Sequence, residues 1–200
     1  MYSIRLTKTT SSLSAPGQGF FDNVGDTRRH GIELKLSGKL KRFDWFLDYT
    51  YLEAEFRDSL TIASANHPLR NANNEIQVES GDRIPSIPRH LFKVGADYAL
   101  SPELSLGADV LFNSDQILRG DESNQLEPVD GYALLNLHGE YRINKHFSAF
   151  AKIDNVLDAD YEGFGIVGGA REVLRPQFDS PRFLSSGAPR AGWFGLKASF

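Results

Sequence analysis

Eight stretches of this 200-residue chain alternate apolar and polar residues with a period of two. Successive side chains of a β-strand point to opposite faces, so each stretch predicts a strand with one apolar and one mixed or polar face. The apolar residues of the eight stretches are Tyr2, Ile4 and Leu6; Ile32, Leu34, Leu36 and Leu40; Phe43, Trp45, Leu47, Tyr49 and Tyr51; Phe92, Val94, Ala96, Tyr98 and Leu100; Leu104, Leu106, Ala108, Val110 and Phe112; Ala133, Leu135, Leu137 and Tyr141; Phe147, Ala149, Ala151 and Ile153; and Gly192, Phe194, Leu196, Ala198 and Phe200. The pattern predicts an all-β chain, with no helix longer than about two turns in the strand region.

The length of these stretches indicates where such strands would lie. Each has about ten residues, which is what a tilted strand needs to cross a bilayer, whereas strands of soluble domains are nearer five or six. Tyrosine and tryptophan lie near the ends of the stretches, as in the interfacial girdles of membrane barrels. No run approaches the ~18 apolar residues of a transmembrane helix. We therefore expect an antiparallel, up-and-down transmembrane β-barrel.

The connections between the stretches alternate between short and long. The short ones are 41–42, 101–103 and 142–146, and the long ones are roughly 8–26, 57–88, 114–131 and 156–190. Ordinary domains rarely contain several loops longer than ~15 residues, whereas outer-membrane barrels combine short periplasmic turns with long extracellular loops. The alternation therefore predicts a bacterial outer-membrane protein whose C-terminus is periplasmic and whose long loops are extracellular.

The chain ends inside its last alternating stretch, on Phe200. Chain ends usually fray at the surface, so a strand that stops on an apolar residue is unusual in a soluble protein. The stretch resembles the C-terminal assembly signal of bacterial outer-membrane proteins, with Phe194, Leu196, Ala198 and Phe200 as its apolar positions and Ala198 where an aromatic residue is usual. It implies the barrel assembly machinery as a partner. The alternative is an ordinary edge strand.

Composition excludes several classes of protein. The chain has no cysteine, so disulfides and thiolate metal sites are impossible, and its net charge of −4 gives no basic surface for nucleic acid. No signal peptide is visible, because the alternating pattern begins directly after Met1. If the chain is a membrane barrel it needs export, so we expect it to be part of a longer protein.

No motif of the chain predicts an enzyme, a cofactor site or a strong metal site. Gly163-Phe-Gly165-Ile-Val-Gly168 matches a dinucleotide-binding pattern, but Pro176 follows and no βαβ unit surrounds it. Asp158, Asp160 and Glu162 resemble the opening of a calcium loop, yet its twelfth position is Gly169 instead of glutamate, which leaves at most a weak surface site. The five histidines lack ligand spacing, and no nucleophile elbow is present.

Three further stretches together resemble the C-terminal barrel region of TonB-dependent outer-membrane receptors. Asn23-Val-Gly-Asp26, followed by Arg29-His-Gly31-Ile-Glu33, is similar to the entry of an outer loop into a barrel strand. Gly81-Asp-Arg83-Ile-Pro85-Ser-Ile-Pro88-Arg89-His90 is similar to the segment that precedes another strand. Asp154-Asn155-Val-Leu157-Asp158-Ala-Asp160-Tyr161 resembles the segment that leads into the last outer loop, with Leu157 where phenylalanine is common.

The resemblance covers essentially residues 1–200 and implies a barrel of about 22 strands with a plugged lumen, of which this chain would supply about the last eight. It implies uptake of a scarce nutrient, most often a ferric siderophore or similar metal chelate. The plug domain and the signal peptide would be absent from this chain. Implied partners are the TonB complex, reached through the missing plug, outer-membrane lipid and lipopolysaccharide, and a small-molecule ligand.

The loops 57–88 and 156–190 are the expected contributors to ligand capture. Arg119, Arg171, Arg175 and Arg182 are the candidate ligand-facing residues, because a guanidinium group binds anionic oxygen atoms in a fixed geometry. Solvated loop charge is the alternative interpretation of these arginines. Two other folds also remain open: a complete eight-stranded membrane barrel with a structural or adhesive role, and a soluble β-sandwich that acts as a binding module.

Overall fold

The chain is built from β-strands alone in its described part. The computed structural model describes residues 2–17, 20–169 and 180–200, and the side chains of 25–169 and 180–200. These residues form twelve strands and no helix, as the alternating pattern predicts. No helix in the described ranges is long and apolar enough to cross a membrane.

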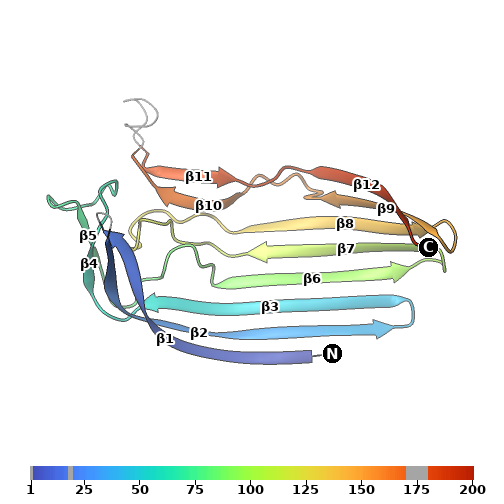
Figure 1. Cartoon of the computed structure of the whole chain (residues 1–200), viewed down its shortest axis with the longest axis horizontal. Helices are drawn as coiled ribbons and strands as arrows, with labels where there is room; N and C mark the ends of the chain where they lie inside the picture. The colour runs from blue at the N-terminus through green and yellow to red at the C-terminus, as the bar shows by residue number, and fades with distance from the viewer. Residues whose placement is uncertain (1, 18–19, 170–179) are drawn as a thin grey trace.

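Eight of the strands form one antiparallel sheet, in which neighbours along the chain are also neighbours in space (Figure 1). In sheet order they are β1 (Tyr2–Gly17), β2 (Phe20–Leu40), β3 (Phe43–Phe56), β6 (His90–Ala99), β7 (Leu104–Asn113), β8 (Tyr132–Arg142), β9 (Phe147–Asp154) and β12 (Ala191–Ala198). Two small hairpins lie at the long-loop end, β4 (Leu60–Ala63) with β5 (Glu75–Val78), and β10 (Glu162–Val167) with β11 (Arg182–Ser186). The expected eight-stranded, up-and-down arrangement is therefore confirmed.

The strand register places the apolar sets on one common face. Leu47 lies opposite Val94, which in turn lies opposite Val110, and Val110 lies opposite Leu135. Directly paired residues of an antiparallel ladder point to the same side of the sheet, so the apolar residues of neighbouring strands form one surface. A shift of one residue in any pair would turn its apolar side chains to the polar face, which explains why alternation fixes the register.

The first predicted loop is wrong, because most of residues 8–26 are extended. β1 and β2 stay paired from Tyr2 and Leu36 up to Gly17 and Phe20, with a register shift between Ser12 and Ser14. The Ser- and Thr-rich sequence there lacks an apolar face, which suggested a loop. Backbone pairing requires no apolar face, and threonine is a good strand former, so the hairpin continues well beyond the alternating segment.

The sheet is open. β1 pairs only with β2 and β12 only with β9, and no ladder joins β1 to β12 among the described residues. A closed eight-stranded barrel is therefore excluded for this structure. A β-sandwich is excluded as well, because no second sheet covers the apolar face of the described strands.

The short turns and both chain ends lie at the same end of the sheet, opposite the two small hairpins (Figure 1). Lys41 makes the two-residue turn between β2 and β3 with a φ of 56°. The last residues fold back on the β8–β9 turn, where the Ser199 amide donates to the His146 carbonyl oxygen over 2.9 Å. The Phe200 ring stacks on His146 with a centroid distance of 5.8 Å.

The motif Arg29-His-Gly31-Ile-Glu33 needs glycine at position 31, because the neighbouring strand leaves no room for a side chain. Gly31 lies opposite Leu52 in the β2–β3 ladder, and a Cβ atom at Gly31 would overlap the backbone oxygen of Tyr51. We expect Gly31→Ala to push the two strands apart and to lower the free energy of unfolding by about 1–3 kcal/mol, measured by urea titration in detergent. Gly192→Ala is the control, because the nearest atom to a Cβ there is 4.0 Å away. Equal stability of the two variants would contradict this role of Gly31.

Candidate functional site: the joined outer loops

The two faces of β3 exchange character beyond Tyr51. Below that point the odd-numbered residues are the apolar set, whereas beyond it the even-numbered residues Ala54 and Phe56 are buried. They pack with Val78 of β5 and with Ile84 in a small core that the β4–β5 hairpin covers. The outer end of β3 is thus a half-buried wall of the loop region instead of a continuation of the apolar face.

The segment 81–90 runs along this wall before it enters β6. Gly81 has a φ of 102°, a left-handed conformation that favours glycine. The Ile84 amide then donates to the Ala54 carbonyl oxygen over 2.9 Å, and the Ile84 side chain enters the small core. The motif therefore turns the loop back and docks it onto β3 before β6 begins.

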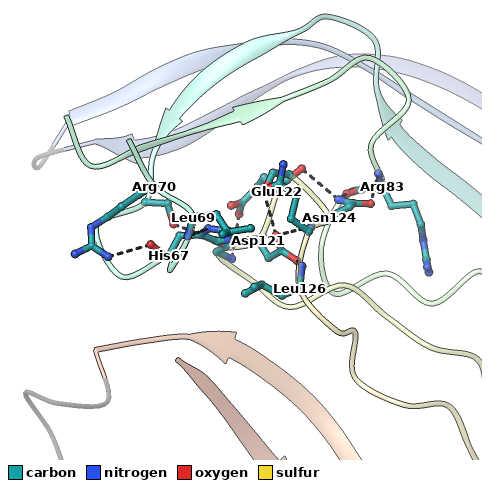
Figure 2. A network of polar contacts seen from close by, with 12 residues as sticks. His67, Leu69, Arg70, Arg83, Asp121, Glu122, Asn124 and Leu126 are labelled. Carbon is teal, nitrogen blue, oxygen red and sulfur yellow. Dashed lines mark hydrogen bonds and ion pairs between the residues drawn. The ribbon is translucent and has the colours of Figure 1, made fainter. Parts of the chain in front are cut away.

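A buried polar cluster joins the loop 57–88 to the loop 114–131 (Figure 2). His67 and Asp121 are both 0% exposed, and His67 Nε2 lies 3.0 Å from Asp121 Oδ1. The Leu69 amide donates to His67 Nδ1 over 3.2 Å. Because Nδ1 accepts this hydrogen bond, the proton of the neutral imidazole must be on Nε2 and must point to Asp121.

Asp121 also organises its own loop. Its carboxylate accepts hydrogen bonds from the Ser123 hydroxyl at 3.1 Å and from the amides of Gln125 and Leu126 at 3.0 and 2.9 Å. Both ring nitrogens of His67 are engaged, by Leu69 and by Asp121, and the Ser123 hydroxyl donates to Asp121, so these three residues do not form the geometry of a nucleophile activated by histidine. The cluster holds the two loops together, and sequence reasoning missed it because His67 and Asp121 are 54 residues apart.

Glu122 lies beside this cluster in a largely buried position. Burial is the main cause that raises the pKa of the Glu122 carboxyl above its ordinary value, against the hydrogen bond that its Oε1 accepts from the Gly120 amide at 3.2 Å. A raised folded-state pKa means that stability falls as the pH rises from the unfolded-state pKa to the folded one. Ionisation of the Glu122 carboxyl therefore lowers the stability of the loop.

A second contact joins the same two loops nearer the sheet. Asn124 accepts the Arg83 amide at 2.8 Å and donates to the Arg83 carbonyl oxygen at 3.0 Å. The Arg83 guanidinium binds the Asp115 carboxylate at 2.6 Å. The loops 57–88 and 114–131 are thus joined at the buried cluster and again nearer the sheet.

The β10–β11 hairpin completes the outer-loop assembly. Val167 of β10 packs with Leu118 and Val129 in a second small core. Arg119 forms backbone hydrogen bonds with β10, donating to the Gly165 carbonyl oxygen and accepting from the Val167 amide. The dinucleotide-like glycine pattern therefore lies mainly on a strand that pairs with another strand, and no helix follows it in the described part of the chain.

The structure describes two of the four predicted ligand-facing arginines, Arg119 and Arg182. Arg119 has an exposed side chain beside Ile166 of β10. Arg182 is already paired, since its guanidinium contacts the Glu127 carboxylate and donates to the Pro128 carbonyl oxygen. Arg171 and Arg175 lie outside the described residues. A role of any of the four in ligand capture stays a prediction.

Asn155 and Asp158 explain the motif that leads into the last outer loop. Both have left-handed backbones, with φ of 49° and 54°. The buried Asn155 side chain donates to the Ala159 carbonyl oxygen and accepts the Ala159 amide, both at 2.9 Å. Asp158 accepts the Arg190 amide at 3.0 Å, which closes the base of the loop. Asp158 thus serves the loop base, and no cluster of three potential metal ligands occurs among the described residues.

Asn155→Ala is expected to lower the free energy of unfolding by about 1–3 kcal/mol, because it leaves buried backbone groups without partners and removes a residue that tolerates a left-handed backbone. Asn155→Gly should recover only the backbone part of that loss. Asp160→Ala, at an exposed position of the same loop, is the control. Thermal unfolding in detergent measures all three, and an Asn155→Ala variant as stable as the Asp160→Ala control would contradict this role.

Three residues of the predicted C-terminal assembly signal, Phe194, Leu196 and Ala198, lie on the edge strand β12, and Phe200 follows it. Phe194 and Phe200 are 92% and 98% exposed, and Leu196 is exposed with them on the apolar face. Ala198, where an aromatic residue is usual, lies opposite Phe147 of β9. Recognition of these residues by the assembly machinery stays a prediction.

Comparison with known proteins gives one consistent family. Residues 3–156 match the model of the family described as "TonB dependent receptor-like, beta-barrel". The chain is 27% identical to the probable TonB-dependent receptor BfrD of Bordetella pertussis over 164 residues, which are 78% of this chain and 20% of that protein. It is 28% identical to the ferric-pyoverdine BN7/BN8 receptor of Pseudomonas putida over 156 residues, which are 74% of this chain and 16% of that protein.

The fold agrees with this result. The crystal structure of the siderophore receptor PiuA from Acinetobacter baumannii matches with a TM-score of 0.76 and 16% identity, over 98% of this chain and 26% of that one. The chain thus spans about a fifth of the length of the curated relatives that it matches. With an open eight-stranded sheet, and with a family match over most of its length, the chain belongs to the TonB-dependent receptor-like β-barrel family.

Proposed function

We propose that this chain is the C-terminal portion of the barrel of an outer-membrane receptor that takes up a ferric siderophore or a similar metal chelate. One observation carries the proposal: an apolar face runs in register across an open antiparallel sheet of eight strands. Such a face needs lipid beside it, and such a sheet needs further strands to close a barrel. The named substrate of one relative, ferric pyoverdine, supports an iron chelate as the cargo.

TonB-dependent receptors are outer-membrane proteins. We propose that the short turns and the C-terminus of this chain face the periplasm and that the joined outer loops face outward. The TonB complex would act through a plug domain that other parts of the protein supply. Outer-membrane lipid and lipopolysaccharide would surround the barrel. The barrel assembly machinery would recognise the exposed aromatic residues Phe194 and Phe200 at the C-terminal end of the chain.

The joined outer loops are the proposed place of ligand capture. Arg119 presents an exposed guanidinium beside the exposed Ile166, which suits a ligand with both anionic and apolar groups. The buried contact of His67 with Asp121 would hold the loop that carries Arg119 in a fixed position. No catalytic step is part of this proposal.

Uptake of radioactive iron tests the proposal. Deleting the gene that encodes this sequence in its host should reduce the uptake of ⁵⁵Fe from at least one ferric siderophore under iron limitation, and the gene supplied in trans should restore uptake. A strain without TonB should show the same loss. Unchanged uptake from a broad panel of iron chelates, with the protein present in the outer membrane, would contradict an iron chelate as the cargo.

A further inference from the structure

A charged patch covers the apolar side of the sheet directly beyond its last apolar pair, Ile32 and Tyr51. Its members, called the rim patch below, are Arg28, His30, Glu53, Glu55, Arg57 and Arg89. Within the β2–β3 ladder, His30 lies opposite Glu53 and Arg28 lies opposite Glu55. Residues two apart on a strand share a face, so these four side chains continue the surface of Ile32 and Tyr51.

Two carboxylates, Glu53 and Glu55, pair with the cationic side chains of the rim patch. Glu55 Oε1 lies 2.6 Å from Arg28 Nη2 and 3.3 Å from Arg57 Nη1. Glu53 Oε1 lies 3.0 Å from Arg89 Nη2, and its Oε2 lies 3.5 Å from His30 Nε2. The rim patch therefore contains three guanidinium groups and two carboxylates, so its net charge is positive even when His30 is neutral.

The guanidinium groups have donors to spare. Each carries five N–H donors, and the carboxylate contacts use only part of them. Arg28 Nε and Arg89 Nε have no hydrogen-bond partner in the structure although both atoms are buried. The side chains of Arg28, Arg57 and Arg89 are 36%, 48% and 40% exposed, so an anion can reach the patch from outside.

A row of aromatic side chains separates the rim patch from the apolar face. The Tyr49 hydroxyl and His90 Nδ1 form a hydrogen bond of 2.9 Å, and the Tyr51 ring lies 5.3 Å from the His90 ring. Tyrosine at this position is typical of the level at which lipid headgroups meet the hydrocarbon. On this face of β2 and β3 the order is thus apolar, then aromatic, then the charged rim patch, which is the order of chain, interface and headgroup in a lipid.

We propose that the rim patch binds the phosphate headgroup of a membrane lipid, whose chains lie on the apolar face beside Ile32. The inference rests on the proposed membrane placement of the chain. Guanidinium groups bind phosphate through paired N–H donors. Glu55 holds Arg28 and Arg57 together, and Glu53, two residues before Glu55 on the same face of β3, holds Arg89. The patch therefore selects the lipid that surrounds this side of the barrel and fixes the depth of β2 and β3 in the membrane.

Native mass spectrometry tests the lipid preference. The protein purified in dodecyl maltoside is mixed with equal amounts of dioleoyl phosphatidic acid and dioleoyl phosphatidylcholine, which share the same chains. Wild type should retain the phosphatidic acid roughly fivefold more often, as expected for a partly exposed charge-assisted contact. The Arg28→Gln, Arg57→Gln, Arg89→Gln triple variant should lose this preference.

The matched control removes three positive charges from the opposite face of the same sheet, with Lys35→Gln, Lys93→Gln and Lys152→Gln. It should keep the preference for phosphatidic acid. If the rim triple variant does not fold, Arg57→Gln alone is the test, because it leaves the pairing of Arg28 with Glu55 in place; it should lower the preference at least twofold.

Three results would overturn the inference. Equal retention of the two lipids by wild type would mean that the arginines serve only their carboxylates. Complete displacement of phosphatidic acid by millimolar inorganic phosphate would indicate a site for free anions instead of a lipid site. Retention of neither lipid would contradict the membrane placement, and the headgroup site would fall with it.

Discussion

Val94→Arg is expected to lower the free energy of unfolding by about 2–4 kcal/mol, which is the cost of arginine at the midplane of a membrane barrel. Val94 lies near the middle of β6, opposite Leu47 of β3 and Val110 of β7. An arginine there would enter the hydrocarbon without a partner. Urea titration of the membrane-inserted protein, followed by the fluorescence of Trp45, measures the loss.

Lys93→Arg is the matched control, because it places the same side chain one residue away on the opposite face. Lys93 lies over the Phe46 ring at 5.5 Å, on the polar side of the sheet. Little change is expected there, since a cation already occupies the position. If Val94→Arg and Lys93→Arg are tolerated equally, the apolar face does not meet lipid.

Asp121→Ala should loosen the loops 57–88 and 114–131 at their buried contact, while the contacts of Arg83 with Asn124 and Asp115 keep them joined nearer the sheet. It leaves the Nε2 proton of His67 and the amides of Gln125 and Leu126 without acceptors inside the protein. A buried donor left without an acceptor costs about 1–3 kcal/mol, and the loss should fall on local opening of the loops because the sheet does not depend on them. Native-state hydrogen exchange of residues 64–70 and 121–126 measures it.

Asp130→Ala is the control for this prediction, since Asp130 lies exposed in the same loop. It should leave the protection of both segments unchanged. Asp121→Asn should give an intermediate loss, because the amide oxygen can still accept some of the hydrogen bonds. Unchanged protection of residues 64–70 in Asp121→Ala would mean that the two loops are held together by other contacts.

The barrel strands could be predicted from the sequence because their pattern is local. In segments such as Phe43 to Tyr51, every second residue reports the face that it occupies, and the common apolar face then fixes the pairing of neighbours. The same rule failed in two ways. First, the predicted strands β1 and β2 were too short at the loop end, because the outer part of this hairpin lacks an apolar face. Second, the rule gave no information on Ala54 and Phe56, where the buried residues of β3 change face.

The loop assembly could not be predicted because it rests on contacts between distant residues. In the sequence His67 is one of five scattered histidines, and only the fold places it beside Asp121. From the sequence Arg182 was expected to be free for a ligand, but in the structure it forms an ion pair with Glu127. The glycine and asparagine positions Gly31, Gly81 and Asn155 are different: the family resemblance pointed to their motifs, and the structure adds the backbone reason for each.

The apolar face has the same height on four neighbouring strands. It covers nine residues from Phe43 to Tyr51, and again nine at 92–100, 104–112 and 133–141. At ~3.4 Å per residue and a tilt of ~45°, nine residues give a hydrophobic belt only about 20 Å tall. A bilayer with the average core of ~30 Å would have to thin around it. We therefore expect the protein to favour a thin membrane and to exclude lipids with long saturated chains from its immediate surroundings.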